Sequence, residues 1–341
     1  MIKLSNRGDA AMPDQDSNRR FIFRELRKKR FKAVLADGSR IAEQVVLVIV
    51  IAVCIFGISL YHSQRAKQDA LNESLRIAAR EKAAAAAKAA AEEKEKEETE
   101  EADPEEDIRE YISPIDFSVT AESNDDIYAW MRIPGTNVDY PLLQSGEGDP
   151  EDFYLDHNVD RSAGYPGCVY SQLFNSKDFS DPVTIFYGHN MKNGTIFATL
   201  HRYEDQSFFD ENPYIFVYTP EQELVYAVYA SYYYSDKLIP YYFNYFGNES
   251  DFTDYLTETE TYGSGDSDHI RDGIEPDASS HIITLSTCNA TGSARYLIQG
   301  VLIDYLGEGA IDETDLAKCD QDLLDGWREA EEALEALPVL E

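Results

Sequence analysis

An uncharged apolar segment, "VVLVIVIAVCIFGISLY" (Val45–Tyr61), constrains this chain more than any other feature. Extended back to Ile41 it covers 21 residues, which make about 31 Å of helix, enough to cross a bilayer. A buried core helix rarely has such uniform aliphatic character around its whole circumference. A cleaved signal peptide is the closer alternative, but the preceding region is long and basic, and no clear small-x-small cleavage site follows. We therefore predict an uncleaved transmembrane helix over residues 41–61.

Charge is distributed very unevenly around this segment. The first 44 residues carry a net charge of +5, with a basic cluster at "RELRKKRFK" (Arg24–Lys32), although the whole chain has a net charge of −34. The positive-inside rule predicts a single-pass cell-membrane protein with a cytoplasmic N-terminus and everything after Tyr61 outside. The acidity of the exterior part excludes nucleic acid as a partner, because phosphate binding needs a basic face.

The segment from Ala79 to Asp107 is rich in Ala, Glu and Lys, which favour helix. It has no apolar stripe, so we expect a semi-rigid stalk with nothing to bury, ended near Pro104. A partner-binding coiled coil is the alternative, but the a/d heptad pattern is missing.

From about Ile108 the composition becomes globular, with short aromatic and β-branched runs between glycines and prolines. About eight such runs without regular βα alternation predict a mostly β fold with helices, built on a barrel. The expected strands are 129–133, 138–144, 167–171, 183–189, 214–219, 224–235, 281–288 and 296–306. Helices are expected at 193–203 and 249–262.

The last segment, Asp312–Glu341, has apolar residues at spacings of three and four and an acidic opposite face. We expect an amphipathic helix that packs on the barrel; a docking helix for a partner is the alternative. The predicted plan is a basic cytoplasmic N-terminus (1–40), a transmembrane helix (41–61), a helical stalk (62–107), a globular domain (108–311) and an acidic C-terminal helix (312–341).

Four cysteines are present, and Cys54 lies in the apolar span. The other three, Cys168, Cys288 and Cys319, cannot all pair with one another, so this is no disulfide-stapled domain. There is no C-x-x-C and no histidine pair at metal spacing, so we expect no zinc site.

Cys288 ends an apolar strand, "HIITLSTC", and Arg295 begins the next one after a short turn. A hairpin would place the two side chains nearly opposite each other. A cysteine nucleophile needs a base or a cation to form thiolate, and arginine is a permanent donor for an oxyanion. The candidate base is His189, also at the end of an apolar strand. Taken singly, each residue also has a structural explanation: a buried cysteine, a hydrogen-bonded histidine and a surface ion pair.

Together these residues resemble the sortase family. Sortases carry a T-L-x-T-C strand, here "TLSTC" (Thr284–Cys288), a later arginine, here Arg295, and an upstream histidine, here in "YGHN" (Tyr187–Asn190). The longer "YGHNMKNGTIF" and the long connection before the cysteine strand are similar to class B sortases. The resemblance covers roughly residues 110–306 and three separated motifs in the expected order.

The resemblance implies an eight-stranded sortase barrel and a membrane-anchored cysteine transpeptidase. Cys288 would attack a C-terminal sorting motif of a surface protein and form a thioacyl-enzyme, which an amine of cell-wall precursor or of a pilin resolves. His189 would act as acid and base, and Arg295 would hold substrate and oxyanion. No metal or organic cofactor is needed for this chemistry, although one sortase class uses calcium.

Four further residues are candidate substrate contacts. Strand alternation places Ser286 on the face of Cys288 and Tyr187 on the face of His189; Thr287 and Asn190 are their neighbours. Two other functions remain open. A papain-like cysteine protease would need its cysteine near a helix N-terminus. A non-catalytic surface module would use Cys288 structurally, as a partner of Cys168.

Overall fold

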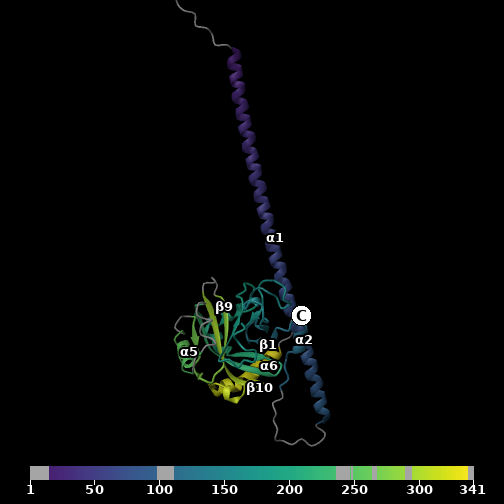
Figure 1. The fold of residues 1–341 in the computed structure, drawn as a ribbon, viewed down its shortest axis with the longest axis vertical. Coiled ribbons are helices and arrows are strands. Elements are labelled where there is room, and N and C mark those ends of the chain that lie inside the picture. Colours follow the sequence, from purple (N-terminus) through teal and green to yellow (C-terminus); the bar gives the residue numbers. More distant parts are fainter. Residues whose placement is uncertain are drawn as a thin grey trace, which may run out of the picture. The chain divides into compact units, whose positions relative to one another are not determined.

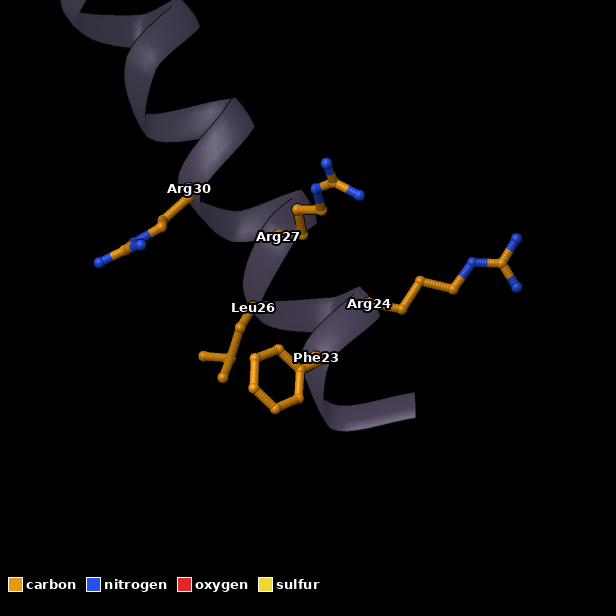
Figure 2. A pocket seen from close by; sticks show the side chains of 5 residues that line it. All are labelled: Phe23, Arg24, Leu26, Arg27 and Arg30. Atoms are coloured by element: carbon orange, nitrogen blue, oxygen red, sulfur yellow. The ribbon is translucent and has the colours of Figure 1, made fainter. Parts of the chain in front are cut away.

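The computed structural model describes residues 15–97, 111–235, 246, 249–262, 267–288 and 294–336. The chain divides into two compact units, one up to Ser63 and one from Gln64 onward. Helix α1 (Gln15–Glu97) contributes to both. Its segment Ile41–Ala90 contains a window of mean hydropathy 2.7 with no residue buried, which is long and apolar enough to span a membrane. Three arginines, Arg24, Arg27 and Arg30, project from the preceding turns (Figure 2).

The second unit contains a closed barrel of eight strands, which confirms the predicted fold (Figure 1). The strand order is β10-β9-β4-β3-β2-β1-β5-β6, and β6 pairs back onto β10 to close the ring. The strands are β1 (Ile127–Arg132), β2 (Asp139–Leu143), β3 (Val169–Tyr170), β4 (Val183–Tyr187), β5 (Tyr214–Tyr218), β6 (Gln222–Tyr234), β9 (Ile282–Cys288) and β10 (Arg295–Gly307). Three short strands add to them: β7 (His269–Ile270) on β6, and a separate pair of β8 (Ile274–Glu275) and β11 (Lys318–Cys319).

Strand alternation divides the side chains between an inner and an outer face. Ile283, Leu285 and Ile298 belong to a buried cluster to which all eight barrel strands contribute, the barrel interior. Ile282 and Leu297 belong to a second cluster that includes residues of α1 and of the helices outside the barrel. Because side chains alternate, Thr284, Ser286 and Cys288 share the outer face with Ile282.

Helix α5 (Glu249–Tyr262) has the bounds predicted for it and packs on this outer face. Gln299 of β10 is fully buried there and accepts hydrogen bonds from Tyr229 and Tyr232 at 3.1 and 3.0 Å. Its amide donates to Tyr255 Oη of α5 at 2.5 Å and to Thr284 Oγ1 at 3.2 Å. Because a buried amide without partners is costly, this network fixes α5 against β9 and β10. Between Ser235 and Glu249 the structure describes only Phe246.

The segment 193–203, predicted as a helix, is only partly helical. Gly194 has φ +84°, a left-handed conformation that starts a turn rather than an α-helix. A 3-10 helix, η2 (Ala198–Glu204), follows it. The other short helices of the described residues are η1 (Phe153–Leu155), α2 (Phe117–Ser123), α3 (Gln206–Glu211) and η3 (Glu313–Asp315).

The part of α1 that follows Gln64 packs against the barrel domain, so the expectation of a stalk from Ala79 with nothing to bury is wrong for the residues around Ala79 and Ala83. Leu75, Ala79 and Ala83 are buried. The small alanine side chain allows close approach: the Ala79 carbonyl accepts a hydrogen bond from the Asp116 backbone N–H at 3.0 Å. Gln68 donates to the Gly167 carbonyl at 3.0 Å. The stretch from 98 to 110, with the predicted helix end near Pro104, lies outside the described residues.

The C-terminal helix α6 runs from Gln321 to Glu335 and packs on the barrel as expected, with Trp327 and Leu334 buried. Trp327 also donates to Asp304 at 2.9 Å. The helix begins later than the predicted Asp312, because η3 and β11 occupy residues 313–319. Buried Arg132 of β1 pairs with Glu335 and donates to the Leu334 carbonyl at 2.8 Å, which fixes the end of the helix. Leu337, part of the predicted apolar face, is outside the described residues.

Candidate active site

Cys288 and Arg295 are directly paired across the antiparallel strands β9 and β10, as the hairpin pattern predicts. Both side chains are half-buried, and Arg295 Nη1 lies 3.0 Å from Cys288 Sγ. Since arginine stays protonated, this contact places the permanent positive charge of the guanidinium next to the sulfur. A thiolate and a developing oxyanion are the species that such a charge stabilises. The turn that joins the strands, residues 289–293, lies outside the described part of the chain.

His189 reaches the same edge of the barrel from β4, which runs parallel to β9 with Tyr187 beside Ser286. The Gly188 backbone N–H continues the ladder by donating to the Ser286 carbonyl at 3.1 Å. A Cβ on Gly188 would meet the Phe197 ring at 2.5 Å, so the tight packing requires glycine at this position. Phe197 then donates to the His189 carbonyl at 3.2 Å. The backbone of His189 is therefore fixed on both sides.

The ring of His189 contacts main chain and an aromatic side chain. Its Nε2 lies 3.0 Å from the Leu155 carbonyl, and the ring centroid lies 4.9 Å from that of Tyr165. In the neutral ring this bond puts the proton on Nε2 and leaves Nδ1 as an acceptor. Burial lowers the pKa of His189, and the positive charge of Arg295 lowers it further, while the bond to Leu155 acts in the opposite direction. Among the described residues, no hydrogen bond joins this ring to the Cys288 thiol.

Two of the predicted substrate contacts lie on the face of Cys288. Ser286 is fully buried, and its hydroxyl has no hydrogen-bond partner among the described residues. Tyr187 is half-buried and stacks on Tyr170 with ring centroids 5.5 Å apart. Burial raises the pKa of Tyr187 to about 12 although Arg295 lowers it, so its phenol stays neutral. Both side chains therefore lie on the outer face of the barrel, near the Cys288 sulfur.

The other two predicted contacts are placed differently. Thr287 points to the opposite face of β9 from Cys288, is fully buried, and has an unpaired hydroxyl among the described residues. Asn190 donates from Nδ2 to the Cys288 carbonyl at 3.0 Å and lies 2.9 Å from His201 Nε2. A substrate role for either residue stays a prediction, and the observed bonds of Asn190 are to other residues of the same chain.

His201 and Glu204 were not singled out as functional by the sequence pattern. They lie on η2, and His201 Nε2 is 3.0 Å from the Cys288 carbonyl. No motif signals this contact, because it depends on how η2 packs under the end of β9. The spacing His201-x-x-Glu204, which joins Nδ1 to a carboxylate at 2.5 Å, is the local signal that could have indicated it.

The remaining cysteines have different surroundings. All four cysteines are free, so the alternative in which Cys288 pairs with Cys168 is wrong. Cys168 is buried, and burial raises the pKa of its thiol to about 12. Burial also raises the pKa of Cys319 to about 11. Within the described residues, no group of three or more His, Cys, Asp or Glu side chains is arranged to hold a metal ion.

Comparison with known proteins agrees with this geometry. The sortase domain family model matches residues 131–303, about half of the chain. The chain belongs to the sortase family, a family of cysteine transpeptidases.

Within that family it is a class B sortase. It is 33% identical over 190 residues to sortase B of Listeria monocytogenes, covering 53% of this chain and 71% of that protein. It is 28% identical over 180 residues to sortase B of Staphylococcus aureus, covering 53% and 70%. The crystal structure of Clostridium perfringens sortase B is 29% identical and superimposes with a TM-score of 0.50, covering 55% of this chain and all of that one.

Proposed function

We propose that this sortase cleaves a C-terminal sorting motif of surface proteins through a thioacyl-enzyme and joins it to an amine. The acceptor would be cell-wall precursor or a pilin lysine. The single observation that supports this most is the 3.0 Å contact between Arg295 Nη1 and the Cys288 sulfur on paired strands, with His189 ending the adjacent strand. A papain-like protease is disfavoured, since Cys288 ends a strand instead of beginning a helix.

In the proposed reaction the Cys288 sulfur adds to the carbonyl carbon of the scissile peptide bond. The resulting oxyanion is stabilised by the Arg295 guanidinium. The C–N bond breaks, and protonated His189 gives its proton to the departing amine. An incoming amine then attacks the thioester and passes a proton to His189, and the C–S bond breaks to release the Cys288 thiolate from which the cycle began. Protons balance over the cycle, because His189 gives one and takes one.

We propose that Ser286 and Tyr187 line the substrate path beside the sulfur. The buried Ser286 hydroxyl supports this, because it has no hydrogen-bond partner among the described residues and would be satisfied by a hydrogen bond to a substrate. The neutral Tyr187 phenol provides an apolar face and a donor at the same place. Thr287, buried on the opposite face of β9, is a less direct candidate.

We further propose that helix α1 holds the enzyme in the cell membrane with the barrel outside. The apolar window of α1 and the basic residues before it support that orientation. Cysteine accessibility in intact cells tests it: a membrane-impermeant maleimide should label Cys288 but not a cysteine introduced at Ser5.

The function is tested with the full-length protein in detergent micelles. Peptides copied from the C-terminal sorting regions of surface proteins of the same organism are incubated with and without hydroxylamine, and products are identified by mass spectrometry. We expect the hydroxamate only with the amine, and an enzyme adduct on Cys288 when the amine is withheld. Cleavage to the free acid with no amine product would contradict transfer and indicate a protease.

A further inference from the structure

Three residues that the proposed chemistry does not use form a hydrogen-bonded group at the carbonyl of Cys288, and two of them contact this oxygen. Asn190 Nδ2 and His201 Nε2 each lie 3.0 Å from this oxygen, and they lie 2.9 Å from each other. Glu204 Oε1 lies 2.5 Å from the other ring nitrogen of His201, Nδ1. The three side chains come from the turn after β4 and from η2, so elements far apart in sequence meet at the last residue of β9.

The positions of the hydrogen atoms on Asn190 and His201 explain how the three residues act together. The Glu204 carboxylate can only accept, so the proton of a neutral His201 ring lies on Nδ1 and Nε2 becomes an acceptor. The two amide hydrogens of Asn190 then go to His201 Nε2 and to the Cys288 carbonyl. In a protonated ring, Nε2–H donates to that carbonyl directly. The Cys288 carbonyl thus has a donor in either protonation state.

The surroundings keep this group rigid. Tyr233 of β6 donates to Glu204 Oε1 at 2.7 Å. The His201 ring stacks on Tyr296 of β10 with centroids 5.1 Å apart, and Tyr296 is completely buried. Asn190 also pairs with Ile196 in an isolated bridge, which closes the turn that carries it. Packing and hydrogen bonds from three sides therefore fix the donors before any substrate arrives.

We propose that Asn190, His201 and Glu204 form a carbonyl clamp whose role is to position the Cys288 sulfur for the reaction. The idea rests on the proposed transpeptidase function for its catalytic consequence. Cys288 is the last residue of β9, where a strand tends to fray. The clamp holds its main chain, and so keeps the sulfur against Arg295. Asn190 directly follows His189 in the chain. The same clamp therefore also fixes the position of the proposed acid–base residue relative to the nucleophile.

The test compares four variants of the full-length protein: Asn190→Ala, His201→Phe, His201→Gln and Glu204→Gln. Phenylalanine keeps the stacking on Tyr296 but removes both nitrogens, while glutamine can still accept from Asn190. The matched control is His281→Gln at the opposite end of β9, where the histidine bonds the Asp181 carbonyl at 2.9 Å. Each variant is measured for kcat and KM in peptide transfer, for thermal unfolding, and for alkylation of Cys288 by iodoacetamide.

We expect Asn190→Ala and His201→Phe to lower kcat by ~10- to 100-fold with KM for the peptide nearly unchanged, because a small misplacement of reacting atoms has effects of this size. His201→Gln should recover most of the loss, Glu204→Gln should lie between, and His281→Gln should match the wild type. Alkylation of Cys288 at neutral pH should slow several-fold in Asn190→Ala and His201→Phe only.

Two outcomes would overturn the clamp: unchanged kcat and alkylation in a folded His201→Phe protein, or an equal loss in His201→Gln and His201→Phe. If Asn190→Ala unfolds, the two His201 variants still decide. Alkylation needs no substrate, so a wild-type protein that fails to transfer peptide would contradict the proposed function and leave the clamp measurable.

Discussion

Cys288 and Cys168 are two cysteines of one barrel that lie in opposite environments. Cys168 precedes β3, is buried, and lies 3.7 Å from the Gln68 amide nitrogen of α1. Its neighbours offer no positive charge within bonding distance in the described part of the chain, and its pKa is raised to about 12. Cys288 is half-exposed at a strand end with a guanidinium 3.0 Å from its sulfur. We infer that positive charge and solvent access, which Cys288 has and Cys168 lacks, decide which of the two thiols can act as a nucleophile.

Removing each sulfur in turn tests whether Cys288 and Cys168 differ in function. Cys288→Ala should lower kcat/KM for peptide transfer by at least ~10³-fold, since no other group in the proposed mechanism can form the thioester. Cys168→Ala should keep activity within about threefold and lower the unfolding temperature slightly, because it removes one buried sulfur. Steady-state assays and thermal melts check both. Comparable activity in the two variants would end the distinction.

Chemical labelling compares the reactivity of the two cysteines without any mutation. With iodoacetamide at pH 8 the native protein should react at Cys288 at least ~100-fold faster than at Cys168, because burial keeps Cys168 protonated and covered. The measurement is peptide mapping by mass spectrometry over time. Unfolding in guanidinium chloride is the control and should make the two rates similar; a fast native reaction at Cys168 would show that burial does not protect it.

Replacing the charged partner tests what the guanidinium adds at Cys288. Arg295→Lys keeps the positive charge but loses the planar fork, so we expect about a tenfold lower kcat. Arg295→Ala should lose more, on the order of 100-fold. Transfer kinetics of both variants, with Arg328→Lys on α6 as the matched control, check the order. An Arg295→Ala variant with full activity would contradict its role.

The smallest expected effect concerns His189. Burial is the main cause of its lowered pKa, and Arg295 is a second, charge-based cause. Arg295→Gln removes a charge that disfavours the imidazolium, so the pKa of His189 should rise. Nuclear magnetic resonance titration of the ring follows it, with Arg328→Gln as the control. A fall in that pKa on loss of Arg295 would contradict the assigned cause.

Much of this architecture was predictable, because the strands are short runs of β-branched and aromatic residues with clear turns between them. The pairing of Cys288 with Arg295 followed from their spacing across a turn, and α5 followed from its polar helical segment. The packing of α1 was missed because alanine is apolar without being large: Ala79 and Ala83 leave no visible stripe, yet their small size allows close contact. The carbonyl clamp was missed because its three residues meet only through tertiary packing.

The packing of α1 on the barrel has a practical consequence for where the protein can be cut. A soluble form that starts at Ile108, where the sequence predicts the globular domain to begin, would expose the surface that covers Leu75, Ala79 and Ala83. It would also leave Asp139 without Arg76 and Arg80, which approach it to 3.4 and 3.6 Å. Leu75 alone contributes about 1.5–3 kcal/mol if its burial is complete. The compact unit that contains the barrel therefore begins at about Gln64, and the part of α1 that follows Gln64 is its first structural element.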